Sequence, residues 1–350
     1  MKTETQKDEV LCMAVTIGDV AREANVSIST ISRVVNGSKA VSTELRQRVD
    51  QAIEKTGYRP NVLARSLITN RTHTIGLAVS DISNSVMAVI AKGISSVCQK
   101  NGYTVIMCET SGKSENEIAI LDKLGEYHVE GLAFAGVNVG RALADKMLEM
   151  SYPVVLVNQK ESYGETRIMT ISYDNYQASY DTAALLIGAG HRRIAMIGGP
   201  ENDYSAGIQR LMGYQKALED AGLEWAESYV QRGDFSFESG FQGMKRIYEE
   251  SMELPTAVLC GSDLVAIGAM QSAYNLGLSV PEDISIIGFD DSEMGRYTRP
   301  TLSTVRIPYF DEGELAANTL LCMIKDPSVK PEFICVRHKV IRRMSITQRK

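Results

Sequence analysis

The chain has 350 residues, of which 44% are hydrophobic and 23% are charged. This length suggests two or three domains, and the composition is that of an ordinary globular protein with a sizeable core. No apolar run approaches the roughly 18 residues that a membrane span needs, and Met1 to Cys12 lack the apolar stretch of an export signal. We therefore expect a cytoplasmic protein with no membrane partner.

The formal net charge of −6 is unevenly distributed along the chain. Residues 1–74 carry 11 Lys and Arg against 8 Asp and Glu, whereas the remaining residues carry 26 against 35. A basic N-terminal segment on an acidic body is typical of a DNA-binding module joined to a separate domain.

Residues 16–58 are expected to form three short helices. Thr16 can cap the first helix, and Asn25 tolerates the left-handed backbone that a sharp helix–helix turn requires. Ser27 can cap the second helix and Ser42 the third. Three helices of this size with a tight turn between the first two predict a helix-turn-helix head.

The segment after the head is predicted to be a hinge. Pro60 favours an extended conformation for the residues before it, and Asn61 to Leu67 could then form a two-turn helix. Such a short helix is marginal alone in water and needs a partner surface to persist. A polar stretch, 68–74, links it to the rest of the chain.

From Thr74 onward, apolar runs typical of buried strands alternate with amphipathic helical patterns. The expected strands are 75–80, 103–108, 132–135 and 154–158 in a first series, and 194–198, 229–233, 257–261 and 284–289 in a second. Two such series predict two doubly wound α/β lobes. Ligands in this architecture bind beyond the carboxyl ends of the strands, here in a cleft between the lobes.

These patterns divide the chain into three parts. Residues 14–60 form the head, 61–73 the hinge helix and linker, and 74–350 the core that binds an effector and dimerises. Within the core, we assign about 74–160 and 292–322 to lobe one, and about 161–291 and 323–345 to lobe two.

Thr16 to Asn36 closely resembles the DNA-binding head of LacI-family repressors, and Tyr58 to Leu67 resembles their hinge. The similarity continues through Asp81-Ile82-Ser83-Asn84, Gly190-His191-Arg192-Arg193-Ile194, Gly233-Asp234-Phe235, Ser262-Asp263 and Ile287-Gly288-Phe289-Asp290-Asp291. It spans about 330 residues. The resemblance implies an all-α helix-turn-helix head on a two-lobe, periplasmic-binding-protein-like core. Met13 then matches the usual start, which makes residues 1–12 a leader or the product of an upstream start codon.

In a helix-turn-helix, the first residues of the second helix meet base edges in the major groove. Here these are Ile28 and Ser29, with Arg33 one turn further on, and a bidentate contact from arginine to guanine is worth about 1–3 kcal/mol of discrimination. Short polar side chains suit phosphate oxygens, although each could instead be a helix cap or solvated surface. The expected DNA contacts are Thr16, Ser27, Ile28, Ser29, Thr30, Ser32, Arg33, Asn36, Tyr58, Asn61, Ala64 and Leu67.

By resemblance, Leu67 wedges into the minor groove at the centre of a palindromic operator, where an apolar side chain kinks the duplex. The alternative is that Leu67 packs on the core domain. Two hinges that meet at one dyad require a homodimer and an inverted repeat of half-sites. No leucine heptad follows Arg343, so we expect a dimer rather than a tetramer.

The resemblance also implies a sugar-, sugar-phosphate- or nucleoside-like effector in the cleft. The residues expected to touch it are Ser80, Asn84, Asn158, Arg210, Phe235, Ser262, Asp263 and Asp290. Arg and Asp bond hydroxyls or a carboxylate, and an aromatic face covers an apolar ring. Alternatively, Asp263 caps a helix and Asp290 orders a loop. The effector would bias the angle between the lobes and so operator affinity, as an inducer or as a corepressor.

Other classes of function find less support in the sequence. The spacings G-x-G-x-x-G, G-x-x-x-x-G-K and G-x-S-x-G are missing, and the four histidines are scattered. The six cysteines form no close pair and have no histidine at metal-ligand spacing. We expect no catalytic residue, no metal and no cofactor. Two alternatives stay open, namely control by a phosphorylated carrier protein that docks on lobe one, and a sugar-binding transport protein.

Overall fold

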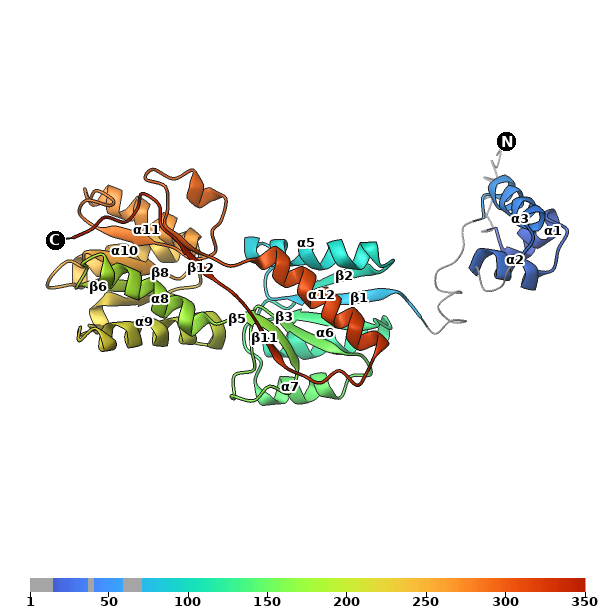
Figure 1. Cartoon of the computed structure of the whole chain (residues 1–350), viewed down its shortest axis with the longest axis horizontal. Coiled ribbons are helices and arrows are strands. Elements are labelled where there is room, and N and C mark those ends of the chain that lie inside the picture. Colours follow the sequence, from blue (N-terminus) through green and yellow to red (C-terminus); the bar gives the residue numbers. More distant parts are fainter. Residues whose placement is uncertain (1–14, 37–40, 59–70, 350) are drawn as a thin grey trace, which may run out of the picture. The chain divides into compact units, whose positions relative to one another are not determined.

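The computed structural model describes residues 15–36, 41–58 and 71–349. The chain divides into two units, Met1–Thr72 and His73–Lys350, each of which has its own internal packing (Figure 1). The first unit contains the predicted head and the second contains the predicted core.

The head consists of three helices that begin and end close to the predicted positions. They are α1 (Ile17–Glu23), α2 (Ile28–Asn36) and α3 (Thr43–Thr56). The Thr16 amide donates to the Asp19 carboxylate over 2.8 Å, and the Leu45 amide donates to Ser42 Oγ over 3.2 Å. Asn25 has a φ of 49°, which is the left-handed conformation expected for the turn between α1 and α2.

The three helices of the head pack their apolar faces around a common core. Hydrophobic residues recur every three or four positions on each helix, so one face of each helix is apolar. The buried members are Val20, Ala21, Ala24, Ile31, Val34, Val49 and Ala52. Because α2 uses Ile31 and Val34 for this core, the opposite face of α2 is left for solvent or a partner.

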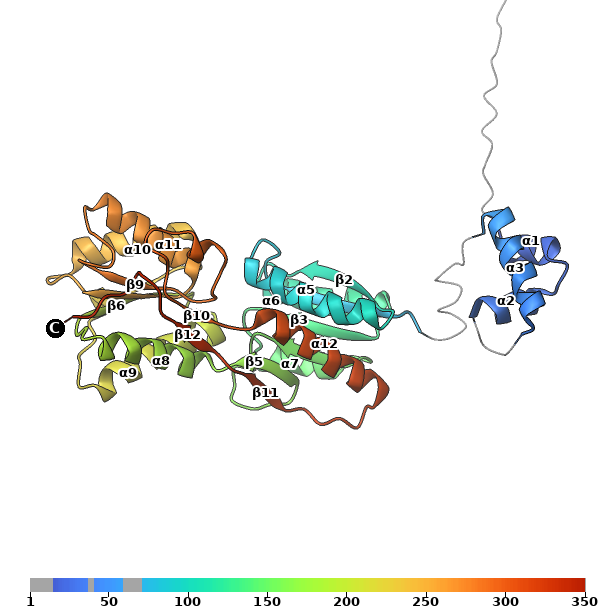
Figure 2. The ribbon, with the colours of Figure 1, turned by 45° about the horizontal axis from the view of Figure 1, so that its top comes forward.

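Lobe one is built on a parallel sheet whose strands lie in the order β11-β5-β4-β3-β1-β2. The strands are β1 (Thr74–Val79), β2 (Thr104–Glu109), β3 (Gly131–Ala135), β4 (Val154–Val157), β5 (Met169–Tyr173) and β11 (Phe333–Val336). Helices α5 (Ser85–Lys100) and α12 (Tyr309–Lys325) lie side by side on one face (Figures 1 and 2). Helices α6 (Ser114–Glu126) and α7 (Arg141–Leu148) cover the other face.

Lobe two repeats this plan on a smaller parallel sheet, in the order β7-β6-β8-β9. Its strands are β6 (Ile194–Gly198), β7 (Val230–Arg232), β8 (Ala257–Cys260) and β9 (Ser285–Ile287). Helices α10 (Phe237–Glu250) and α11 (Asp263–Asn275) pack on one face, and α8 (Asn175–Gly188) and α9 (Gln209–Asp220) on the other (Figure 1). The two doubly wound lobes predicted from the alternating pattern are therefore present.

Short elements complete lobe two and its connections. A π-helix, η1 (Tyr204–Ile208), precedes α9, and two 3-10 turns, η2 (Glu227–Tyr229) and η3 (Met294–Arg296), lie in loops. The strands β10 (Thr304–Arg306) and β12 (Lys339–Ile341) form an antiparallel pair.

The expected lobe boundaries need correction. Met169–Tyr173 and Phe333–Val336, both assigned to lobe two from the sequence, pair with each other in the sheet of lobe one. Leu302, assigned to lobe one, packs in the core of lobe two. The chain passes between the lobes after β5, after β10 and after β11. Strand composition does not reveal which sheet a strand joins, because either lobe offers it the same apolar surface.

Candidate functional site

The first residues of α2 form an exposed polar and apolar surface on the head. Ser27 Oγ accepts a hydrogen bond from the Thr30 amide at 3.2 Å and lies 2.8 Å from the hydroxyl oxygens of Ser29 and Thr30. Ile28 is 55% exposed although it is a large apolar residue, and Arg33 is exposed one turn further on. The helix thus presents an apolar group, hydroxyls and a guanidinium on the side opposite its buried face.

Other predicted DNA contacts of the head have structural partners. The Thr16 hydroxyl donates to the Asp19 carboxylate at 2.7 Å, so it belongs to the cap of α1. Tyr58 is half-buried and packs against the core of the head. Ser32 lies on α2 and is half-buried. The side chain of Asn36, and all of Asn61, Ala64 and Leu67, lie outside the described residues, as does the predicted hinge helix.

Arg210 lies at the centre of the contacts between the two lobes. Its side chain comes from α9 and is only 4% exposed. Nε donates to Asn175 Oδ1 at 2.8 Å, and the two terminal nitrogens donate to the Gly261 carbonyl and to the Tyr173 hydroxyl. The guanidinium carbon lies 3.8 Å from the centroid of the Phe289 ring. Stacking on an aromatic face stabilises a cation that is taken out of water.

Asp290 follows β9 and reaches the other lobe. The hydroxyl of Tyr309, the first residue of α12, donates to Asp290 Oδ1 at 2.7 Å. Asp290 has a φ of 109°, an unfavourable conformation that the surrounding structure must hold in place. Burial raises the pKa of this carboxyl to about 6, against the opposing effects of the Arg210 charge and the Tyr309 hydrogen bond.

Aromatic rings surround this polar centre. The Tyr173 ring lies 6.2 Å from Phe289 and 6.3 Å from Tyr309, measured between centroids. Phe235 has a φ of 65° and its ring lies 5.9 Å from the Arg210 guanidinium carbon. A β-carbon on Gly199 would lie 2.1 Å from this ring, so only glycine permits Phe235 its position.

Ser262 and Asp263 are held by contacts within the protein. Ser262 caps α11, accepting from the Val265 amide at 3.1 Å. The Asp263 carboxyl is 1% exposed and accepts from Thr304 Oγ1 and from the Ser292 amide, both at 2.6 Å. Burial, followed by the nearby Asp290 charge, raises its pKa to about 7. These two residues therefore order the loops behind the site.

The predicted residues of lobe one lie at strand ends, as the pattern implied. Ser80 follows β1, and Asn84 caps α5 by accepting from the Val86 amide at 2.9 Å. Asn158 follows β4, and its backbone amide donates to Glu312 Oε1 at 2.8 Å. Its side-chain oxygen is buried and has no hydrogen-bond partner among the described residues.

Several residues at this site were not predicted from the sequence. They are Tyr173 on β5, Asn175 at the start of α8, Phe289 next to Asp290, and Tyr309 and Glu312 on α12. Tyr309 and Glu312 come from a helix far along the chain, and no local motif marks them. Only the return of the chain to lobe one brings them to Asp290 and Asn158.

Lys160 adds a second connection between the lobes. Its amide donates to Ser205 Oγ at 3.2 Å and its ammonium to Gln209 Oε1 at 3.3 Å. The ammonium also lies 5.8 Å from the centroid of the Tyr204 ring. Ser205 and Tyr204 belong to η1, and π-helical turns are frequent at functional sites.

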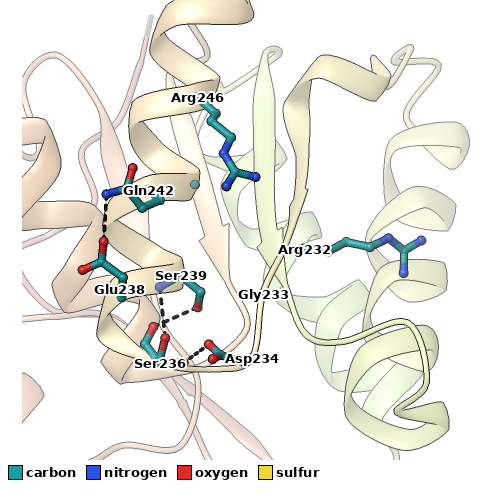
Figure 3. A pocket seen from close by; sticks show the side chains of 9 residues that line it. Arg232, Gly233, Asp234, Ser236, Glu238, Ser239, Gln242 and Arg246 are labelled. Carbon is teal, nitrogen blue, oxygen red and sulfur yellow. Dashed lines mark hydrogen bonds between the residues drawn. The ribbon is translucent and has the colours of Figure 1, made fainter.

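A separate surface pocket lies between β7 and α10 (Figure 3). It has a volume of about 260 Å³ and includes Arg232 and Arg246. It adjoins the loop that carries Phe235 but contains none of the predicted effector residues. Glu201 pairs with Arg232 at 3.2 Å, so part of its positive charge is already neutralised.

The described part of the chain shows neither a metal centre nor a membrane helix. Across residues 15–36, 41–58 and 71–349, no three His, Cys, Asp or Glu side chains gather as they would around a metal ion. Within the same ranges, no helix combines the length and the apolar character needed to cross a bilayer.

Comparison with known families and proteins agrees with this geometry. Residues 16–61 match the family "Bacterial regulatory proteins, lacI family", and residues 183–346 match a "Periplasmic binding protein-like domain". Catabolite control protein A of Priestia megaterium is 35% identical over 333 residues, covering 95% of this chain and 99% of that protein. The ribose operon repressor of Haemophilus influenzae is 36% identical over 331 residues, covering 95% and 98%.

Solved structures show the same fold along nearly the whole chain. The lac repressor dimer bound to operator and the anti-inducer ONPF has a TM-score of 0.88 at 26% identity, covering 95% of this chain and 99% of that one. The complex of the transcriptional regulator CelR with cellobiose has a TM-score of 0.72 at 30% identity, with the same coverage. The chain therefore belongs to the LacI family of DNA-binding transcriptional repressors that are controlled by a small-molecule effector.

Proposed function

We propose that this protein is a homodimeric repressor of carbohydrate or nucleoside metabolism genes, acting on a palindromic operator in the cytoplasm. The effector is a sugar-, sugar-phosphate- or nucleoside-like compound that binds between the lobes of the core. The observation that carries the proposal is the exposed face of α2, where Ile28 is more than half exposed at the start of a helix-turn-helix.

The chemistry of the α2 face suits the major groove. Ile28 can contact a thymine methyl group, and Arg33 can donate two hydrogen bonds to a guanine. The amides and hydroxyls at the start of α2 suit phosphate oxygens. In the relative whose structure contains operator, the protein is a dimer, which supports an inverted repeat as the DNA partner here.

The chemistry of the cleft suits a polar organic effector. Arg210, Asp290 and Asn158 supply donors and acceptors, and the rings of Phe235 and Phe289 supply apolar faces. Similar regulators are solved with cellobiose or with ONPF, which supports a small molecule at the corresponding place. An effector shifts the arrangement of the lobes only if it binds one arrangement better than the other.

Fluorescence anisotropy with fragments of the host genome tests the DNA-binding part. We expect one or a few fragments to bind tightly, and log affinity to fall steeply with log salt concentration as counterions are released. A library of random duplexes of equal length is the control. Equal affinity for every fragment would contradict the proposed sequence-specific repressor.

A thermal-shift screen of sugars, sugar phosphates and nucleosides tests the sensing part. A compound that binds only the folded core raises its melting temperature in proportion to the logarithm of its concentration. We expect such a compound to change operator affinity in the same concentration range. A core that no member of the screen stabilises would contradict the proposed class of effector.

A further inference from the structure

Glu312 is a fully buried acidic residue on α12, and one of its carboxyl oxygens has no hydrogen-bond partner among the described residues. It is 0% exposed, and its Oε1 accepts the Asn158 amide at 2.8 Å. Its Oε2 is buried and has no hydrogen-bond partner among the residues that the structure describes. Buried polar atoms in native proteins nearly always have a partner, so an unsatisfied one indicates a missing water or ligand.

Asn158, which is bonded to Glu312 through its backbone amide, carries a second unsatisfied atom. Its Oδ1 is buried and also lacks a partner in the described ranges. Its backbone amide donates to both Glu312 and the Ile171 carbonyl. Asn158 has a φ of 61°, a left-handed conformation that asparagine and glycine adopt more readily than other residues. One backbone hydrogen bond thus joins the two residues that carry the unsatisfied oxygens.

Glu312 and Asn158 lie near the residues that connect the two lobes. Glu312 follows Tyr309 by three positions on α12, so both share a helix face, and Tyr309 reaches Asp290 of lobe two. Glu312 is also close enough to Tyr173, the partner of Arg210, for its charge to raise the pKa of that phenol. The pair therefore adjoins the residues that connect the two lobes.

Burial sets the protonation state of Glu312. It raises the pKa of this carboxyl to about 8, and the Asn158 amide only partly opposes the shift. Its titratable neighbours are Tyr173 on β5 and Cys335 on β11, neither of which supplies a positive charge. At neutral pH, Glu312 is thus an uncharged acid, and its proton belongs on Oε2 because Oε1 already accepts a hydrogen bond.

We propose that Glu312 and Asn158 together bind one hydroxyl group of the effector. Glu312 Oε2 donates to the hydroxyl oxygen, and the hydroxyl hydrogen is donated to Asn158 Oδ1. A hydroxyl is both donor and acceptor, so it satisfies both atoms at once. A phosphate oxygen has no hydrogen to give Asn158, and an ammonium group has no lone pair for Glu312. The inference rests on the proposed function and specifies which group of the effector meets lobe one.

Three variants of the full-length protein test whether binding needs the donor on Glu312, the acceptor on Asn158 or a negative charge on Glu312. Glu312→Gln keeps Oε1 and replaces the Oε2 hydroxyl by an amide that also donates. Glu312→Leu removes both polar atoms. Asn158→Gly removes the acceptor oxygen, keeps the backbone amide and suits the positive φ. Glu161→Gln is the control, because Glu161 is also buried in lobe one but its oxygens are already bonded to the Arg167 and Ile168 amides and to the Tyr163 hydroxyl.

The probes are D-ribose, cellobiose and adenosine, which carry hydroxyls and no phosphate, together with ribose 5-phosphate. Affinity for the probe that stabilises the wild-type protein is measured by calorimetry. We expect Glu312→Gln and Glu161→Gln to bind it within about threefold of wild type, whereas Glu312→Leu and Asn158→Gly lose at least tenfold, as expected when a buried hydrogen-bonding group loses its partner. Circular dichroism and operator binding report whether each variant is folded.

Each other outcome contradicts the inference in a different way. Wild-type affinity in folded Glu312→Leu and Asn158→Gly would mean that neither side chain contacts the effector. Equal losses in Glu312→Gln and Glu312→Leu would mean that the Glu312 carboxylate is charged and accepts from the hydroxyl, which would contradict the proposed donation from Oε2. A loss of affinity in Glu312→Leu for ribose 5-phosphate but not for D-ribose would exclude a shared hydroxyl as the bound group, because the two probes differ only in the phosphate. If no probe binds wild type, the proposed effector class fails, and this inference fails with it.

Discussion

Arg33 and Ile28 lie on the solvent side of a helix whose other side carries Ile31 and Val34. The buried pair is 0% and 7% exposed, whereas Ile28 is 55% exposed. An exposed isoleucine adds little to the stability of the folded head, and Ile28 is therefore available to a partner. At the scale of single residues, the proposed DNA contacts are therefore side chains of α2 that the core of the head leaves exposed.

Replacement of Arg33 by alanine tests the base contact. We expect Arg33→Ala to cost about 1–3 kcal/mol of discrimination at one operator position and to leave weak nonspecific binding in place. Anisotropy titrations with operator variants, one base pair changed at a time, measure this. Arg22→Ala is a matched control, since Arg22 pairs with Asp19 on the exposed surface of α1. A uniform loss of affinity on all sequences would show that Arg33 contacts phosphate instead.

Replacement of Asp290 by alanine tests the sensor. The carboxylate bonds Tyr309 across the lobes and lies far along the chain from the head, so we expect Asp290→Ala to keep operator affinity within about threefold. The effector response should be abolished, because the site loses its acceptor. Titrations of operator with and without effector measure both the operator affinity and its response to effector. An unaltered response would remove Asp290 from the effector site.

At the scale of elements, the turn between α1 and α2 decides whether the recognition surface forms. Asn25 takes the left-handed conformation there, and the Val26 amide donates to the Ala21 carbonyl at 3.0 Å to close the turn. The helices on both sides carry the apolar core of the head. A change in this turn therefore alters how α2 is presented without touching any proposed DNA contact.

Substitutions at Asn25 separate backbone conformation from side-chain chemistry. Asn25→Val should destabilise the head by about 1–2 kcal/mol, since a β-branched residue is strained at positive φ. Asn25→Gly should leave stability almost unchanged because glycine accepts this conformation freely. Hydrogen exchange of the head amides measures both effects. Equal stability of the two variants would contradict the assigned turn.

At the scale of the whole molecule, three buried acids make the stability of the core depend on pH. Burial raises the pKa of Asp290 to about 6, of Asp263 to about 7 and of Glu312 to about 8. In the unfolded chain these groups ionise near their ordinary values of about 4. The folded state therefore holds protons that the unfolded state has already released.

The sign of the pH effect follows directly from these shifts. The contribution of each acid to the free energy of unfolding is complete below its pKa in the unfolded chain and is lost as the pH rises through its pKa in the folded protein. The loss is up to about 1.4 kcal/mol per pH unit for each acid between these two pKa values. We expect the melting temperature of the core to fall between pH 5 and pH 8. In Glu312→Gln the fall between pH 7 and pH 8 should be smaller. Calorimetric scans at each pH measure this, and a melting temperature that rises over the range would contradict the shifts.

A network around Asp291 holds the segments that join the lobes. Its carboxylate is 3% exposed and pairs with Arg306 at 2.6 Å, Arg296 at 3.2 Å and the guanidinium of Arg343. Arg306 ends β10 and Arg343 follows β12, so the two crossing strands meet at one charge. Asp290 contacts Tyr309 of lobe one, while Asp291, the next residue, holds the segments that join the lobes.

The sequence by itself determined the head, the alternating pattern of the core and the family. Short-range signals are enough for these features, since caps, turn residues and helix periodicity act over three or four positions. Arg210, Phe235, Asp290 and Asn158 were also predicted, because strand ends mark the cleft in a doubly wound fold. Their roles as effector contacts stay predictions.

Tertiary contacts specify which strands share a sheet and which distant residues contact Asp290 and Asn158. The parallel pairing of β5 with β11 joins segments more than 150 residues apart, and no local pattern specifies such a partner. The same return of the chain brings Tyr309 and Glu312 to Asp290 and Asn158. The physical reason is that burial and hydrogen bonding depend on neighbours in space, so an acid such as Glu312 gains its unusual protonation only after folding.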